Sequence, residues 1–161
     1  NYNAPGQTVV AGHAGAVARL TESVTKAGGK AIVLKVSAPF HSPLMKPAAA
    51  EVAGALAEVP LRPLAFPVIA NVDAEPNQDP ARVAELLVRH VDAPVQWVRS
   101  VERAKALGVD TMLEIGPGKV LAGLVKRIDK SIRVLSVSDG PSLDAALREL
   151  PEASGARAPS R

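Results

Sequence analysis

The amino-acid sequence predicts an α/β fold, because its patterns indicate strands that alternate with helices. Short apolar runs that barely alternate with polar residues are typical of buried strands. Longer segments with apolar residues three and four positions apart are typical of amphipathic helices. Clusters of Gly and Pro separate the two kinds of segment. Strands joined by helices of this length favour parallel pairing, at least in the second part of the chain, and no internal repeat is visible.

The N-terminal part is predicted to contain two strands around one helix. Residues 8–12 form a short β-rich run, and a helical pattern extends over residues 13–27. The two glycines at 28–29 are a typical helix stop. The run Ala-Ile-Val-Leu-Lys-Val at 31–36 predicts a largely buried strand, since it barely alternates.

The middle of the chain is predicted to form two helices around one strand. Ser42 and Pro43 are typical of an N-cap and a first helical turn, and apolar residues with helical spacing continue to Val59. Residues 67–72 predict the next strand. Residues 79–91 predict a helix that begins with an Asp-Pro pair and has one apolar face.

The last third of the chain alternates regularly between the two kinds of element. Helix, strand, helix, strand and helix are predicted, in this order, at residues 94–107, 111–115, 120–128, 132–137 and 143–150. Gly108 is expected to stop the first of these helices. Residues 151–161 are rich in Pro, Ser, Ala and Gly, and they predict a disordered tail.

Composition limits the classes of function. A hydrophobic content of 47% is enough for a buried core, and the absence of long apolar runs predicts no membrane span. The net charge of +3 is scattered and only 2% of residues are aromatic, which argues against nucleic-acid binding. Zero cysteines exclude a disulfide scaffold, and the three histidines are too far apart in sequence to predict a metal site. With no secretion leader visible, we expect a cytoplasmic protein.

The segment Val-Ser-Ala-Pro-Phe-His-Ser-Pro-Leu-Met at 36–45 carries the strongest functional signal. It places His41 on a proline-bounded loop between an apolar run and a helix start, where catalytic side chains tend to lie. Imidazoles titrate near neutral pH and therefore suit proton transfer. Two further segments stand out: Asn-Tyr-Asn-Ala-Pro-Gly-Gln at 1–7 and Glu-Ile-Gly-Pro-Gly-Lys-Val-Leu at 114–121.

These three segments, in this order, resemble the malonyl-CoA:acyl carrier protein transacylases of fatty-acid and polyketide synthesis. The resemblance implies an α/β-hydrolase-like large subdomain with an inserted ferredoxin-like small subdomain. On that template residues 1–37 are the closing half of the small subdomain, and residues 38–141 are the C-terminal part of the large one. Residues 142–161 are then a short helix and the tail.

The resemblance also implies an activity: transfer of a malonyl group from malonyl-CoA to the phosphopantetheine of an acyl carrier protein. Both thiol carriers are substrates, so no cofactor is expected. The serine nucleophile of the family lies in a Gly-His-Ser-x-Gly elbow, and this sequence contains none. We therefore expect the base-carrying half of the enzyme, inactive without the missing N-terminal half. The alternative is a catalytically inert fragment or a docking module for acyl carrier protein.

The resemblance assigns His41 the role of general base and acid, which takes the proton of the serine and returns it to the leaving thiol. It places His90 where the family has a glutamine whose main-chain carbonyl orients the catalytic histidine. His90 equally fits a helix C-terminus, where the helix dipole favours it. Phe40 is predicted to exclude the methyl group of methylmalonyl substrates, or else to belong to the core.

Three further residues and one segment have interpretations that remain open or structural. Asn3 and Gln7 either hydrogen-bond the pantetheine arm or organise the turn between them. Ser42, next to the histidine, is predicted to cap the following helix and not to act as a nucleophile. Residues 116–119, Gly-Pro-Gly-Lys, lack the spacing of a phosphate-binding P-loop and predict a tight strand-to-helix turn.

Overall fold

The computed structural model describes residues 1–150, and the predicted disordered tail at 151–161 lies outside them. Helices make up most of its regular structure: α1 (Ala14–Lys26), α2 (Lys46–Ala57), α3 (Val83–Asp92), α4 (Trp97–Ala106), α5 (Val120–Ile128) and α6 (Gly140–Glu149), with 3-10 turns η1 (Pro43–Met45) and η2 (Pro80–Arg82). The strands are short: β1 (Tyr2–Ala4), β2 (Gln7–Thr8), β3 (Val68–Ile69), β4 (Pro76–Asn77), β5 (Thr111–Ile115) and β6 (Arg133–Val137). None of these helices is long and apolar enough to cross a membrane.

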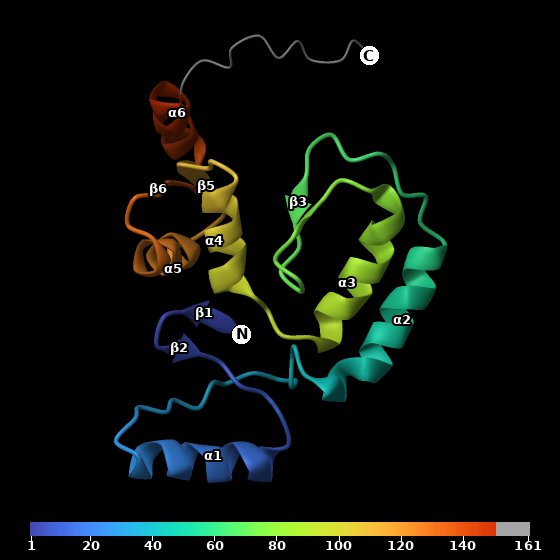
Figure 1. Ribbon diagram of the computed structural model, residues 1–161, viewed down its shortest axis with the longest axis vertical. Coiled ribbons are helices and arrows are strands. Elements are labelled where there is room, and N and C mark those ends of the chain that lie inside the picture. Colours follow the sequence, from blue (N-terminus) through green and yellow to red (C-terminus); the bar gives the residue numbers. More distant parts are fainter. Residues whose placement is uncertain (151–161) are drawn as a thin grey trace.

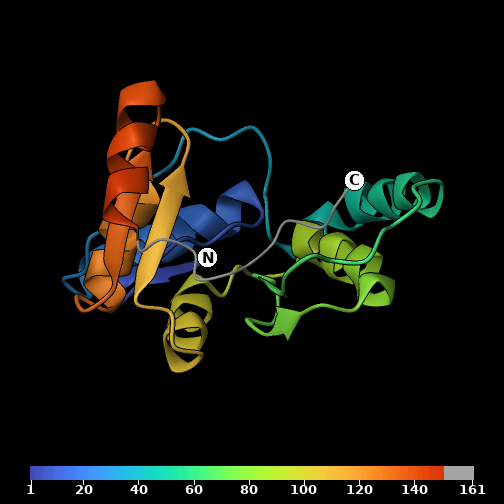
Figure 2. The same ribbon diagram turned by 90° about the horizontal axis from the view of Figure 1, so that it is seen from above.

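The elements form two groups (Figures 1 and 2). One group holds β1, β2, α1 and the C-terminal elements from α4 to α6, so that it contains both ends of the described chain. The other group holds α2, α3, β3 and β4, and in it α2 and α3 pack side by side. Hydrogen bonds join the groups where α3 leads into α4: Tyr2 N–H donates to the Val95 carbonyl at 2.9 Å, and Gln96 N–H donates to the Asn71 carbonyl at 2.7 Å.

The strands pair two by two within the described residues. β1–β2 and β3–β4 are antiparallel hairpins, and β5–β6 is a parallel pair with Leu113 opposite Leu135. The α/β class is therefore confirmed, and the parallel pair lies in the last third of the chain as the connections predict. The subdomain boundaries near residues 37 and 141 stay predictions.

The centre of the hydrophobic core lies in the C-terminal group. It consists of Val101 on α4, Val125 on α5 and Ile132 just before β6, each at most 3% exposed. Burial of each such side chain stabilises the fold by about 1.5–3 kcal/mol. Partly buried side chains surround this centre: Trp97, Met112, Ile128 and Val134. Since α4 and α5 also contact β1, the core ties the start of the chain to its end.

The prediction of a buried strand at 31–36 is wrong for this structure. The segment has no regular secondary structure, and Ile32 and Val33 are 69% and 72% exposed. An apolar β-rich run becomes a strand only where a neighbouring strand pairs with it, and no described strand lies beside this one. Two other predicted strands are also short in the structure: of residues 8–12 only Thr8 lies in a strand, β2, and 67–72 is reduced to β3.

The predicted helices all exist, with boundaries that local interactions shift. The last helix begins at Gly140 and not at residue 143, because Asp139 caps it. The Asp139 carboxylate accepts from Ser142 N–H at 2.9 Å, and the Ser142 hydroxyl oxygen accepts from Asp139 N–H at 3.0 Å. This reciprocal capping box satisfies two donors that the helix leaves unpaired. An Asp before Gly-Pro-Ser is a sequence signal for such a start.

Residues 116–119 form the tight turn that the sequence predicts. Gly116 and Gly118 have φ values of +135° and +93°, which residues other than glycine rarely adopt. The turn brings the N-terminus of α5 back to Glu114. The Glu114 carboxylate accepts hydrogen bonds from Leu121 N–H at 2.9 Å and from Ala122 N–H at 3.0 Å. An anion at a helix N-terminus satisfies unpaired donors and favours the helix dipole, so Glu114 is the cap of α5.

Replacement of Glu114 by alanine is expected to lower the free energy of unfolding by about 1–2 kcal/mol, because α5 loses the acceptor at its N-terminus. Urea denaturation of the purified chain measures the loss. Glu51→Ala is the matched control, since Glu51 is exposed on α2 and makes no hydrogen bond or ion pair to another described residue. Equal losses in the two variants would contradict the capping role.

Candidate functional site

His41 lies on the loop that leads into η1, and its backbone is in the left-handed region, with φ +57°. This region is sparsely populated by residues other than glycine, and its occupation costs about 1–3 kcal/mol. Strained backbone of this kind persists only where surrounding contacts hold it, and two hydrogen bonds do so at this loop.

Ser42 makes the first of these bonds. Its hydroxyl donates to the Pro39 carbonyl at 2.7 Å, and the residue is only 6% exposed. Ser42 stands at the N-cap position of η1, but its side chain makes no capping bond, so the predicted cap is wrong. The tight turn at His41 explains the difference, because it brings the Pro39 carbonyl within reach of the hydroxyl. The hydroxyl proton is therefore directed at Pro39 and not at the His41 ring.

The second bond joins His41 to a residue far away in the sequence. The Nδ1 atom of His41 lies 3.0 Å from the main-chain oxygen of His90, 49 residues further on. His90 is in the last turn of α3. A carbonyl there would accept from the N–H four residues later, but that residue is Pro94, which has no N–H. The carbonyl of His90 is thus left available to His41.

This bond determines which ring nitrogen of His41 carries a proton. A carbonyl oxygen only accepts hydrogen bonds, so in the neutral imidazole Nδ1 must be the donor. Nε2 is then unprotonated, and its lone pair can accept a proton from another group. A half-buried imidazole held in this tautomer has the properties of a general base.

The imidazole of His90 also contacts His41. The ring centroids are 5.2 Å apart, the planes meet at 30°, and the rings are stacked. Burial lowers the pKa of His90 from its ordinary value of 6.5, and the nearby His41 lowers it further. The His90 Nε2 atom is buried without a hydrogen-bond partner among the described residues. His90 therefore favours its neutral form.

None of the remaining predicted residues forms a hydrogen bond with His41 in the described structure. Phe40 is 49% exposed, so it is not a core residue of the described structure, and it adjoins His41 in the chain. The side-chain oxygen of Gln7 accepts from the Arg127 guanidinium, which also donates to the Pro5 carbonyl at 3.1 Å. This contact favours the turn-organising interpretation of Gln7. Asn3 is half-buried on β1, and no described hydrogen bond connects it to His41.

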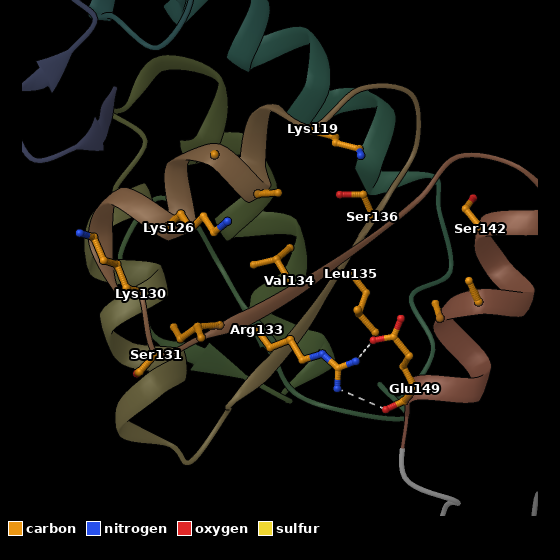
Figure 3. Close-up of a pocket in the computed structure, with 15 residues that line it drawn as sticks. Lys119, Lys126, Lys130, Ser131, Arg133, Val134, Leu135, Ser136, Ser142 and Glu149 are labelled. Atoms are coloured by element: carbon orange, nitrogen blue, oxygen red, sulfur yellow. Dashed lines mark hydrogen bonds and ion pairs between the residues drawn. The ribbon is translucent and has the colours of Figure 1, made fainter.

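One cavity of the described residues is separate from these residues. It has a volume of about 750 Å³ and lies between α5, β6 and α6 (Figure 3). Lysines at 119, 126 and 130 border it, and Arg133 forms an ion pair with Glu149 on its wall. None of the predicted site residues lines this cavity. We place the candidate site at His41, because among the histidines of the described residues it is the one whose ring contacts a main-chain carbonyl that fixes its tautomer.

A metal centre has no support in the described residues. Within 1–150, His, Asp and Glu side chains nowhere gather in a group of three that could hold a metal ion.

One sequence signal for this site that the motifs do not include is the spacing between His90 and Pro94. A proline four residues after a helix C-terminal residue predicts an available carbonyl, and this signal is readable without a structure.

Comparison with known proteins gives matches along nearly the whole chain. The family described as acyl transferase domain matches residues 1–148. Malonyl CoA-acyl carrier protein transacylase of Salmonella typhimurium is 44% identical over 150 residues, which are 92% of this chain and 48% of the relative. The Bacillus subtilis protein of the same name is 40% identical over 153 residues, covering 94% and 48%. The chain spans about half the length of the curated relatives it matches.

Solved structures agree with these matches. The crystal structure of MCAT from Streptococcus pneumoniae superposes with a TM-score of 0.86 and 40% identity, covering 93% of this chain and 49% of that one. A complex of a type II PKS acyl-carrier protein with its malonyl-transacylase gives a TM-score of 0.89 and 42% identity, again covering 93% and 49%.

Acid is expected to destabilise the fold partly through His90. The folded state lowers the pKa of His90 below 6.5, so the unfolded state binds more protons in the window beneath that value. The contribution of His90 to stability is therefore present above 6.5 and is lost as the pH falls through the lowered pKa. Urea unfolding at about pH 7.5 and about pH 5 should show a smaller acid loss for His90→Gln than for the unsubstituted chain. His13→Gln is the control at an exposed histidine, and an undiminished loss in His90→Gln would contradict this prediction.

Proposed function

The chain belongs to the acyl transferase domain family, and from this premise we propose that it supplies the catalytic base for malonyl transfer from malonyl-CoA to an acyl carrier protein. The resemblance to malonyl-CoA:acyl carrier protein transacylases, inferred from three motifs, is confirmed by relatives of that name at 40–44% identity. The observation that carries the proposal is the contact between His41 Nδ1 and the His90 carbonyl, which leaves Nε2 unprotonated.

In the proposed mechanism His41 moves one proton in each half-reaction. Nε2 first takes the proton of a serine hydroxyl as the serine oxygen attacks the malonyl thioester. The imidazolium then gives this proton to the CoA sulfur as the carbon–sulfur bond breaks, and an acyl-serine remains. In the second half-reaction Nε2 takes the proton of the pantetheine thiol, the sulfur attacks the acyl-serine, and the proton returns to the serine oxygen. The His90 carbonyl stabilises the imidazolium of each step by accepting from Nδ1.

The nucleophile of this mechanism lies outside these 161 residues in our proposal. No Gly-x-Ser-x-Gly segment occurs in the sequence. Ser42 is the serine next to His41 in the chain, and its hydroxyl proton is engaged with the Pro39 carbonyl. We therefore place the serine in the half of the relatives' length that this chain does not match, and we propose that the chain alone is inactive.

The proposed partners follow from the same chemistry. They are malonyl-CoA, an acyl carrier protein and the N-terminal half of the same enzyme, in the cytoplasm, with no cofactor. The net charge of +3 suits the phosphates of CoA and an acidic carrier. A relative solved in complex with an acyl-carrier protein supports that partner.

His41→Ala, introduced into a polypeptide that joins this chain to the serine-bearing half, is expected to lower malonyl transfer by about two to four orders of magnitude. The rate is measured from malonyl-CoA to carrier protein. Intact mass spectrometry after malonyl-CoA should show one malonyl adduct on the joined protein and none on the present chain. His13→Ala is the control, since His13 is exposed at the start of α1. A wild-type rate in His41→Ala would overturn the proposed base.

Phe40→Ser is expected to weaken discrimination against methylmalonyl-CoA. The half-exposed ring adjoins His41 and is proposed to occupy the space that the extra methyl group needs. Removal of such a steric contact reduces the preference for malonyl by about ten- to hundredfold, measured as the ratio of kcat/KM values. The control is Phe66→Ser, because Phe66 is the second phenylalanine of the chain and is 70% exposed. An unchanged ratio in Phe40→Ser would contradict the specificity role.

A further inference from the structure

His41 and His90 make a second contact, between their rings, that the proposed mechanism does not use. Orientation through the main chain needs only a carbonyl, which any residue at position 90 supplies. The structure nevertheless places the imidazole of His90 against the His41 ring, with centroids 5.2 Å apart and an interplanar angle of 30°. This second contact requires its own explanation, because it depends on the identity of the side chain.

We propose that the side chain of His90 is a positioning residue for His41: its imidazole face holds the plane of the His41 ring, which keeps Nδ1 on the carbonyl and Nε2 directed at the reacting hydroxyl. The inference rests on the proposed function of His41 as the base. It adds a role for the His90 ring that is separate from the role of the His90 carbonyl.

One hydrogen bond does not fix an imidazole ring. The bond holds Nδ1 near the carbonyl, but the second side-chain torsion of histidine is broad, so the ring can still swing about this atom. Such a swing moves Nε2, the atom that takes the proton. A flat surface stacked on the ring restricts this swing, and the His90 imidazole provides one. The torsion matters more here because the His41 backbone, at φ +57°, is itself in a sparsely populated region.

Helix packing holds the backbone of His90 in place. The residue belongs to the last turn of α3, a helix that packs along α2. It also borders a second cavity, of about 230 Å³, whose wall is mostly apolar and includes Leu64, Leu86 and Leu87. The apolar wall also disfavours charge on His90, so no second cation repels the imidazolium that forms on His41.

The experiment compares His90→Gln, His90→Leu and His90→Ala. All three variants keep the main-chain carbonyl. Glutamine keeps a planar group, leucine keeps bulk without a plane, and alanine keeps neither. A role of the stacked plane therefore predicts that glutamine rescues what leucine and alanine lose, whereas a simple packing role predicts that leucine rescues as well.

The first readout is the protonation pattern of the His41 ring, observed through nitrogen-15 NMR of this chain above the titration range. The chain has three histidines, and the exposed His13 serves as the internal reference for a ring that averages both tautomers. His41 is expected to show the Nδ1–H form alone in the unsubstituted chain and in His90→Gln. In His90→Leu and His90→Ala its shifts should move toward those of His13. Identical His41 shifts in all four proteins would overturn the inference.

The second readout is transfer kinetics in the polypeptide that carries the serine half. Misplacement of Nε2 is expected to lower kcat by about ten- to hundredfold in His90→Ala and His90→Leu, with KM little changed. His90→Gln should stay close to the unsubstituted rate. Equal kcat values for glutamine and leucine would overturn the positioning role. Failure of the proposed function appears differently, as full activity in His41→Ala, and it leaves the NMR result intact.

Discussion

The geometry of the candidate site depends on a hydrogen bond that α3 is unable to make. In a continuous helix the carbonyl of His90 would accept from the N–H of the residue four positions later, and that residue is Pro94. The unpaired carbonyl lies 3.0 Å from His41 Nδ1 and accepts its proton. An otherwise ordinary loop histidine thereby acquires a fixed tautomer. The missing N–H of Pro94 therefore has two consequences: α3 ends, and the free carbonyl of His90 fixes the tautomer of His41.

The rest of the structure brings these two residues together across 49 positions. Packing of α2 along α3 returns the chain from the His41 loop to the C-terminal turn where His90 lies. The Ser42–Pro39 hydrogen bond tightens the loop from the other side, at 2.7 Å. These contacts offset the cost of the left-handed backbone at His41. The strain is thus located at the residue whose ring orientation matters, as is typical of functional sites.

The sequence predicts an element well when the information for that element is local. The strand at 111–115 and the helix at 120–128 have the predicted boundaries, because glycines and an apolar pattern lie beside them. The His90 carbonyl was assigned to His41 through a family resemblance, although the proline four residues later carries the same information physically. The Ser42–Pro39 bond and the stacked imidazoles were not predictable, since both depend on a left-handed turn and on packing between distant segments.

The largest difference between the predicted and the observed structure is the strand at 31–36, which is absent, and it too depends on packing between distant segments. Helix α1 has an apolar face and buries none of its residues, and the apolar run at 31–36 stays exposed without a pairing strand. The apolar pattern of a segment indicates which face could be buried. Whether that face is buried depends on the segments that pack against it. The described residues match only about half the length of the solved relatives. Among the described residues, no strand pairs with the run at 31–36, so an apolar pattern that suits a buried strand stays exposed.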